Sequence, residues 1–164
     1  MDLPQRKNIR LKEYDYSKNG AYFITICIKN KQQMLWLPVV GATRGRPPLS
    51  SIGEVIDKEI NKIPTIYKNV EIDKYVILPN HIHLIISLNG NEDGRPEVTP
   101  TVSHIIKYFK GSISKQIGFS IWQKLFHDHI IRNEAEYLKI WEYIDTNPLK
   151  WQKDCYYSDG TVLT

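Results

Sequence analysis

Hydrophobic residues along the chain occur in two patterns. One is typical of β-strands and the other has the spacing of an α-helix. Four runs rich in β-branched and aromatic residues predict strands, at 21–28, 70–78, 81–88 and, with less regular alternation, 124–132. Only Pro79 and Asn80 separate the second run from the third, which predicts a tight antiparallel hairpin. The first run is apolar on both faces, so we expect it to be a central strand.

Two further segments carry apolar residues at helical spacing. The first helix is predicted to begin with Ser51 and Glu54 as a capping box and to end at the break made by Pro64. The second is predicted to be capped by Thr99, with Pro100 in its first turn. The connections before each helix contain a Gly-Arg-Pro sequence, and we expect both to be exposed loops.

A last helix is predicted to start with the capping-box pair Asn133 and Glu136 and to end near Asn147 and Pro148. The element order is then β-α-β-β-α-β-α. This order predicts an α+β, ferredoxin-like (RRM-like) fold, with a four-stranded antiparallel sheet, two helices on one face and an added C-terminal helix. With 164 residues, 41% of them hydrophobic, we expect a single domain over 1–164.

Side-chain alternation on the third strand places His81 and His83 on the same face of the sheet. The apolar residues of the other face must meet the two helices, and these are Ile82, Leu84, Ile86 and Leu88. Both imidazoles are therefore expected on the open face, close enough for two ring nitrogens to reach one ion. Two polar residues at the start of a strand are the alternative interpretation of the pair.

The last helix places Glu136, Ile140, Tyr143 and Asn147 on one stripe. A phenol has a pKa of about 10, and a nearby cation or base can favour the phenolate, which attacks phosphorus. The amide oxygen of Asn147 suits Mg²⁺ or Mn²⁺ beside two imidazole nitrogens. With 10 tyrosines in the chain, a simple packing role for Tyr143 is the alternative.

These residues carry a resemblance to a known family. The segment His81-Ile82-His83 resembles the His-hydrophobic-His motif of the HUH endonucleases, and YIDTNP (143–148) resembles the Tyr-Ile-x-x-Asn-Pro signature of REP-associated tyrosine transposases, within the Y1 transposase superfamily. Supporting similarity extends from about residue 10 to about residue 151, with its main segments at 14–27, 75–86 and 122–133.

The resemblance implies that His81 and His83 bind a metal ion, that Tyr143 is the catalytic tyrosine and that Asn147 is a third ligand, where insertion-sequence relatives commonly carry Gln. Tyr137, about 1.7 turns before Tyr143, should face elsewhere. The implied reaction is metal-dependent cleavage and rejoining of single-stranded DNA through a 5′-phosphotyrosine, with Mg²⁺ or Mn²⁺ and no organic cofactor. The implied substrate is a hairpin of the REP type, and both a monomer and a homodimer stay open.

A formal net charge of +4 favours a polyanionic partner. The residues predicted to contact DNA phosphates are Lys107, Lys110, Arg10, Arg44, Arg46 and Arg95. Solvation of an ordinary surface is the alternative for each of them. Trp36 and Trp122 are candidates for base stacking or for packing.

Two other functional classes stay open. A non-catalytic RRM-like module would stack single-stranded bases on the open face, although histidines replace the paired aromatics that such modules use. A metal-dependent phosphohydrolase would activate water and leave Tyr143 dispensable. The spacing of Cys27 and Cys155 fits neither a disulfide framework nor a metal site, and no apolar run reaches the roughly 20 residues of a membrane span. We therefore expect a cytoplasmic protein. The implied DNA substrate would bring it to the nucleoid.

Overall fold

Four strands and three α-helices follow one another in the predicted order. The computed structural model describes residues 20–37, 48–89 and 100–148. Its elements are β1 (Gly20–Cys27), a short 3-10 helix η1 (Lys29–Lys31), α1 (Ser51–Ile66), β2 (Val70–Ile77), β3 (His81–Leu88), α2 (Val102–Ile117), β4 (His127–Ile131) and α3 (Glu134–Thr146). The fourth strand is shorter than predicted, and the other strand boundaries agree with the prediction to within one residue.

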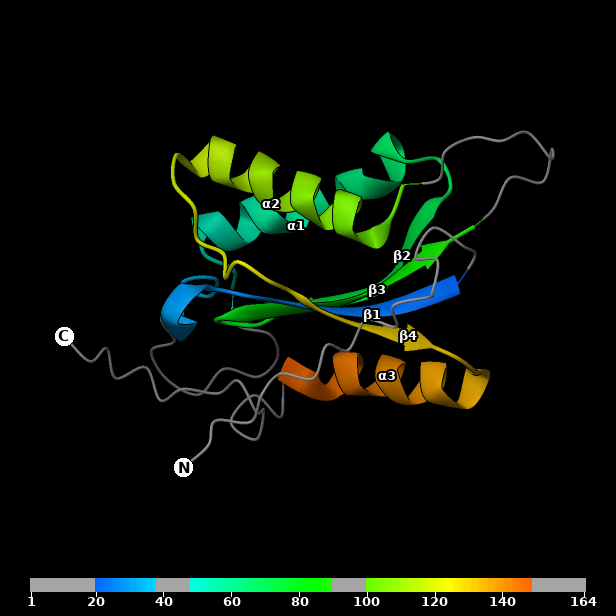
Figure 1. The fold of residues 1–164 in the computed structure, drawn as a ribbon. Helices are drawn as coiled ribbons and strands as arrows, with labels where there is room; N and C mark the ends of the chain where they lie inside the picture. Colours follow the sequence, from blue (N-terminus) through cyan, green and yellow to red (C-terminus); the bar gives the residue numbers. More distant parts are fainter. Residues whose placement is uncertain (1–19, 38–47, 90–99, 149–164) are drawn as a thin grey trace, which may run out of the picture.

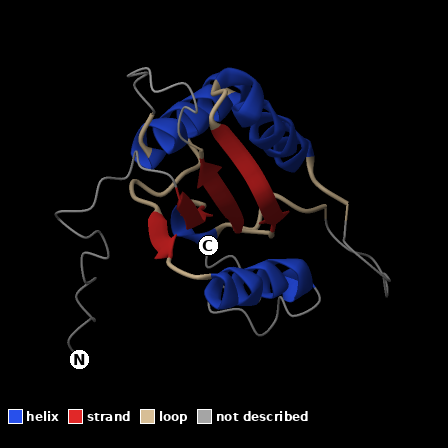
Figure 2. Cartoon of the chain, turned by 90° about the vertical axis from the view of Figure 1, so that its right-hand side faces the viewer, coloured by secondary structure: helices blue, strands red, loops and turns tan. Residues whose placement is uncertain are grey.

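The strands form one sheet in the order β2-β3-β1-β4, and every neighbouring pair is antiparallel. Helices α1 and α2 cover one face, and α3 lies against the other (Figure 1). Figure 2 shows the same three layers from the side, with the strands between the helix pair and the single helix. The ferredoxin-like α+β prediction is therefore confirmed, and β3 and β1 are the central strands.

Each face of the sheet has its own hydrophobic core. The larger core lies under α1 and α2 and takes its strand residues from alternate positions, including Ile24 and Ile26 of β1 and Ile82, Leu84, Ile86 and Leu88 of β3. The smaller one lies under α3 and is built around Val76, Leu78, Ile85 and Ile144. The two cores follow the period of two along β1 and β3, so the parity of a residue on these strands decides which helix layer it meets.

The start and the end of α1 both differ from the prediction. Ser50, not Ser51, is the N-cap, and its hydroxyl accepts a hydrogen bond from the backbone N–H of Gly53 at 3.1 Å. The helix also continues two residues beyond Pro64. Proline is tolerated there because it stands in the last turn, where the loss of one backbone hydrogen bond affects little of the helix.

The N-terminus of α2 also lies further along the chain than predicted. Thr101 is the N-cap and accepts a hydrogen bond from the backbone N–H of His104 at 3.2 Å, while Pro100 precedes the helix. Thr99 lies outside the described residues. The later start makes Val102 the first helical residue and buries it completely. Either threonine is a good N-cap by residue type, and the burial of Val102 favours Thr101.

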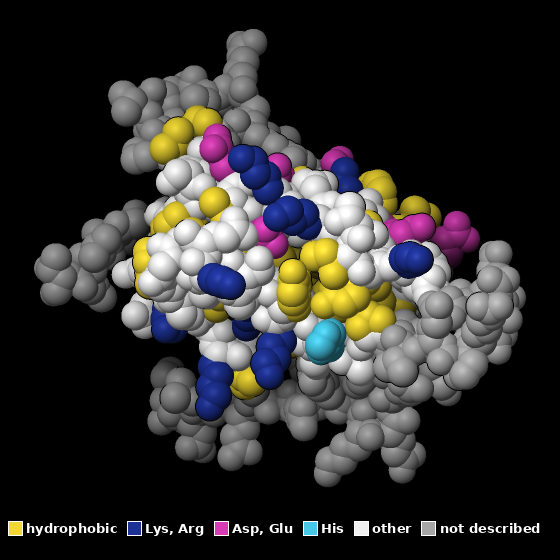
Figure 3. All heavy atoms as spheres, turned by 90° about the horizontal axis from the view of Figure 1, so that it is seen from above, with side chains coloured by type: hydrophobic (Ala, Val, Ile, Leu, Met, Phe, Trp, Pro, Cys, Tyr) yellow, Lys and Arg dark blue, Asp and Glu magenta, His cyan; other side chains and the backbone are white. Residues whose placement is uncertain are grey.

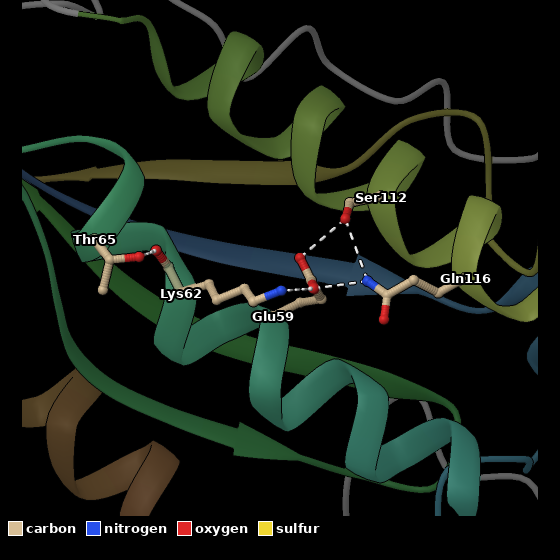
Figure 4. A network of polar contacts seen from close by, with 5 residues as sticks. All are labelled: Glu59, Lys62, Thr65, Ser112 and Gln116. Carbon is tan, nitrogen blue, oxygen red and sulfur yellow. Dashed lines mark hydrogen bonds and ion pairs between the residues drawn. The ribbon is translucent and has the colours of Figure 1, made fainter.

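A buried polar network joins α1 to α2 (Figure 4). Glu59 is only 3% exposed, and its carboxylate accepts hydrogen bonds from Lys62 at 3.3 Å, Ser112 at 3.0 Å and Gln116 at 2.7 Å. Burial raises the pKa of this carboxyl, but the three hydrogen bonds outweigh burial and hold the pKa below its usual range. The negative charge of Glu59 is therefore stabilised by neighbours on α1 and α2, and within the described residues it makes no contact with the other face of the sheet.

Trp122 and Trp36, the two candidates for base stacking, both have packing roles, and Trp36 is only partly buried. Trp122 is 3% exposed and contacts Phe109, with ring centroids 5.8 Å apart. The indole nitrogen of Trp36 donates to the carbonyl of Ile77 at 2.7 Å. Cys27 is a buried free thiol, and Cys155 lies outside the described residues. Among the described helices, none has the length and apolar content needed to cross a bilayer.

Candidate active site

The two imidazoles of β3 lie together at the start of the strand. The side chains of His81 and His83 have ring centroids 4.6 Å apart, and their Nε2 atoms are separated by 3.0 Å. They share one face of the sheet, as predicted, but that face is not open. Helix α3 covers it, and the two residues are 0% and 1% exposed. The helix packs there because Ile144 must be buried and completes the smaller core.

Polar neighbours hold the outer nitrogen of each ring. Nδ1 of His81 lies 2.8 Å from Oδ1 of Asn80, and Nδ1 of His83 lies 2.9 Å from Oγ1 of Thr25. Because an amide oxygen accepts, Nδ1 of His81 carries the proton and its Nε2 presents a lone pair. Phe23 stacks on the ring of His83 at 5.2 Å. These contacts orient both Nε2 atoms toward a common point.

The separation of the two Nε2 atoms suits a shared metal ion. Two nitrogens bound at about 2.1 Å and at right angles around one ion lie about 3.0 Å apart. Without an ion, an Nε2–H of His83 can donate to the lone pair on Nε2 of His81, and a divalent cation would take the place of that proton. The donor set and its spacing therefore fit a divalent cation.

Asn147, the predicted third ligand, is buried at the C-terminus of α3. No group of three or more His, Cys, Asp or Glu side chains in the described ranges could hold a metal ion. Asn147 caps the C-terminus of α3, is 3% exposed, and has a buried Oδ1 with no hydrogen-bond partner among the described residues. A buried oxygen left without a partner costs about 1–3 kcal/mol, so this atom calls for a functional explanation.

Tyr143 reaches the histidines from α3 and is also open to solvent. Its hydroxyl lies 3.4 Å from Nε2 of His83, and the two rings are 5.3 Å apart. Phe23 meets the Tyr143 ring edge-on at 6.2 Å. The residue is 40% exposed, so part of the side chain faces solvent. A potential nucleophile and a potential metal pair thus meet within one chain.

The second tyrosine of α3 has a different environment. The hydroxyl of Tyr137 donates to Oδ2 of Asp73 at 2.8 Å. Burial, together with this carboxylate, raises the pKa of Tyr137 to about 12. The side chain stays protonated and faces away from the histidines, as predicted, so it is not a competing nucleophile.

Glu136 lies on the predicted stripe but serves the start of α3. It pairs with His129 and accepts a hydrogen bond from the backbone N–H of Arg132 at 3.0 Å. That backbone hydrogen bond, followed by the one from His129, lowers the pKa of the Glu136 carboxyl. Asn133 caps the same helix by accepting from the N–H of Glu136 at 2.8 Å, as predicted. These contacts join α3 to the end of β4.

The predicted DNA contacts lie apart from this site or outside the described residues. Lys107 is exposed on α2, on the other side of the sheet from Tyr143. Lys110 donates to the carbonyl of Gln123 at 2.9 Å and lies over the Phe126 ring, and burial lowers its pKa. Figure 3 shows the α1 and α2 face, where basic side chains are scattered rather than gathered in one stripe. The remaining candidates, Arg10, Arg44, Arg46 and Arg95, are outside the described ranges.

Sequence reasoning missed the residues that orient the histidines. Asn80 directly precedes His81, and its place in a tight turn was the only signal available. Thr25 is 58 residues from His83, and the β1–β3 register makes them direct partners. Phe23 shares that face of β1 two residues earlier. Only knowledge of the strand pairing could have brought Thr25 and Phe23 to the site.

No protein-family model matches the chain. It is 34% identical to an uncharacterised protein of Haemophilus influenzae, with 96% of each chain covered. It is 28% identical to the REP-associated tyrosine transposase of Escherichia coli K12, over 84% of this chain and 73% of that protein. A putative REP-associated tyrosine transposase of Haemophilus influenzae is 25% identical, over 83% of this chain and 74% of that protein.

A solved structure supports the same comparison. The structure of a REP-associated tyrosine transposase bound to a REP hairpin superposes with a TM-score of 0.62 and 27% sequence identity. The match covers 86% of this chain and 74% of that chain. Sequence and fold therefore point to the same relatives.

Proposed function

The chain belongs to the Y1 transposase family, and we propose that it cleaves and rejoins single-stranded DNA with Tyr143 as the nucleophile. The observation that carries the proposal is the position of the Tyr143 hydroxyl, 3.4 Å from Nε2 of His83, where the two Nε2 atoms of the histidine pair converge. The Tyr143 ring also packs against Phe23 and His83, and its 40% exposure adds access from solvent to this proximity.

The residues that would hold a metal ion are His81, His83 and Asn147, with Mg²⁺ or Mn²⁺ as the proposed ion. Two imidazole nitrogens beside an amide oxygen form a mixed donor set, in which Mn²⁺ is the better match and Mg²⁺ is acceptable. When bound, such an ion polarises the scissile phosphate and neutralises charge on its oxygens. Thr25 and Asn80 keep the two rings in the orientation that this requires.

In the proposed step, the Tyr143 oxygen attacks the scissile phosphorus in line with the leaving group. A bond forms between the phenol oxygen and phosphorus, and the bond from phosphorus to the 3′ oxygen breaks. The phenol proton passes through solvent to the departing 3′ oxygen. The products are a 5′-phosphotyrosine and a free 3′-OH, and a second 3′-OH reverses the step to join a different end.

The proposed substrate is a DNA hairpin with a single-stranded flank. The solved relative is bound to a REP hairpin, and we extend that class of ligand to this chain. Tyr143 is partly exposed whereas the two imidazoles are buried under α3, and a flexible single strand suits such a site better than a rigid duplex.

A denaturing gel tests the proposal. A labelled hairpin with a single-stranded flank is incubated with the protein and Mn²⁺, and a protein–DNA band that survives denaturation is expected. Tyr143→Phe should abolish this band. Tyr108→Phe is the matched control, because Tyr108 is 47% exposed on the opposite face and should keep full activity.

The other outcomes separate the alternative functions. Cleavage that persists in Tyr143→Phe without a covalent band would indicate a phosphohydrolase, in which the histidine pair activates water. Hairpin binding without cleavage in any divalent metal would indicate a binding module. The coverage of the sheet face by α3 argues against the latter, because an RRM-like module needs that face for base stacking.

A further inference from the structure

Strand β2 contains a bulge that turns two charged side chains toward α3. Its register against β3 shifts between Ile72 and Lys74, so Asp73 is an extra residue without a Cα partner. Ile72 and Tyr75 pack against the core under α1 and α2, whereas Asp73 and Lys74 both contact residues of α3. A regular strand would send only one of two consecutive side chains to that face, and bulges are common where a side chain must be redirected.

The carboxylate of Asp73 joins the two elements that carry the proposed active site. Its Oδ2 accepts a hydrogen bond from the hydroxyl of Ser87 at 2.5 Å and another from that of Tyr137 at 2.8 Å. Ser87 is on β3, on the same face as His81 and His83, and Tyr137 is on α3, six residues before Tyr143. One acceptor therefore connects the strand of the histidines to the helix of the nucleophile.

These hydrogen bonds fix the position of α3 along the direction of β3. Ser87 is four residues beyond His83, or about 13 Å along the strand, and Tyr137 is about 9 Å from Tyr143 along the helix. Since Tyr137 approaches Ser87 while Tyr143 approaches His83, the helix and the strand run in opposite directions. A slip of one helical turn, about 5.4 Å, would separate the phenol from the imidazole.

The apolar contacts of α3 are mostly partial, because Tyr137, Ile140 and Trp141 are only partly buried against the smaller core. Ile144 is its one fully buried hydrophobic residue among those described, and Leu138 is 58% exposed. Lys74 adds a second polar contact, with its amine 2.7 Å from Asp145 and 4.9 Å from the centre of the Trp141 ring. That ion pair is exposed and contributes little on its own. The hydrogen bonds of Asp73 are partly buried and are therefore better protected from water.

We propose that Asp73, through Tyr137 and Ser87, is a positioning residue that sets the register of α3 and thereby places Tyr143 beside the histidine pair. The inference rests on the proposed function, because it assigns Asp73 a role in that same reaction. Misplacement of a reacting group by about 1 Å can lower a rate by about 100-fold. Loss of this register should therefore slow the chemical step more than it weakens DNA binding.

The test compares two tyrosines on opposite sides of the sheet. Tyr137→Phe removes only the hydroxyl that donates to Asp73. Tyr75→Phe is the matched control, because Tyr75 donates to Asp57 at 2.5 Å and joins the same strand, β2, to α1. Single-turnover cleavage at saturating hairpin and Mn²⁺ should be about 10-fold to 100-fold slower in Tyr137→Phe, with hairpin Kd within about twofold of wild type. Tyr75→Phe should cleave at the wild-type rate.

Substitution of Asp73 itself gives a second comparison. Asp73→Ala removes the acceptor and should lower the cleavage rate at least as much as Tyr137→Phe. Asp73→Asn keeps an oxygen that can accept from both hydroxyls, and it should restore most of the rate. An equal rate loss in both Asp73 variants would overturn the register role.

Hydrogen exchange of the backbone amides provides a measurement that is independent of DNA cleavage. Tyr137→Phe should accelerate exchange in α3 and leave α1 and α2 unchanged, whereas Tyr75→Phe should not affect α3. Unchanged cleavage and α3 exchange in Tyr137→Phe, or equal rate losses in Tyr137→Phe and Tyr75→Phe, would overturn the inference. A wild-type protein that forms no covalent adduct would instead refute the proposed function, and with it the catalytic consequence of this register.

Discussion

Replacement of Thr25 by valine isolates the contribution of one hydroxyl to the proposed metal pair. Thr25 is 4% exposed, and its Oγ1 lies 2.9 Å from Nδ1 of His83. Valine is also β-branched and similar in size, so the strand and its packing should be retained. The variant leaves Nδ1 of His83 buried without this polar partner, while the ring itself remains in place.

The size of the effect follows from the contacts that remain. A buried polar group that loses its partner costs about 1–3 kcal/mol, which for a chain of this length lowers the Tm by roughly 2–10 °C. Loss of an outer partner of a metal-binding histidine typically weakens metal binding by about 10-fold to 100-fold. Phe23 still stacks on the His83 ring at 5.2 Å, and we therefore expect the lower end of this range, about 10-fold.

The assay is a titration of Mn²⁺ followed by calorimetry and, in parallel, by covalent-adduct formation with the hairpin. Thr25→Val should raise both the Kd for Mn²⁺ and the Mn²⁺ concentration at half-maximal cleavage by about 10-fold. At saturating Mn²⁺ the cleavage rate should approach that of the wild type. Thr65→Val is the matched control, because it removes an exposed hydroxyl that donates to the carbonyl of Lys62 at the end of α1.

Two results would refute this reasoning. In the first, Thr25→Val binds Mn²⁺ with wild-type affinity while His83→Ala does not, so the hydroxyl does not orient the ring. In the second, His83→Ala binds Mn²⁺ as tightly as the wild type, so the imidazole pair is not the metal site.

Three further predictions concern other parts of the molecule. Asn147→Ala should weaken Mn²⁺-dependent cleavage at least 10-fold. It should change the free energy of unfolding by less than about 1 kcal/mol in urea titration, because the buried Oδ1 has no hydrogen-bond partner among the described residues. A large loss of stability would indicate a structural role. The lowered pKa of Glu59 means that its contribution to stability is present above the usual carboxyl pKa of about 4.5 and is lost as pH falls through the lower folded-state value. Glu59→Gln should therefore flatten the acid side of a plot of Tm against pH, and an unchanged slope would contradict this account. Gly53→Ala should lower the free energy of unfolding by about 1–3 kcal/mol in thermal unfolding, because an added Cβ would lie 2.3 Å from the carbonyl oxygen of Leu35. Stability equal to that of the wild type would show that the backbone adapts.

Local patterns determined the order of the elements and the face on which the histidines lie. The period of two in β3 is a property of consecutive residues, so it placed His81 and His83 together without any knowledge of the rest of the fold. The spacing of Tyr143 and Asn147 on one helix is local in the same sense. The helix starts were predicted less accurately, since neighbouring Ser and Thr residues cap equally well in isolation and tertiary burial selects between them.

The enclosure of the site was decided only by tertiary structure. The sequence predicted α3 but not that it packs against the histidine face, because an amphipathic helix can bury its apolar stripe on any available surface. The pairing of Thr25 with His83 and the bulge at Asp73 both depend on strand register, which long-range contacts determine. Residue types and their local spacing therefore identified the reactive groups, whereas the packing of distant segments brought the groups within reach of one another.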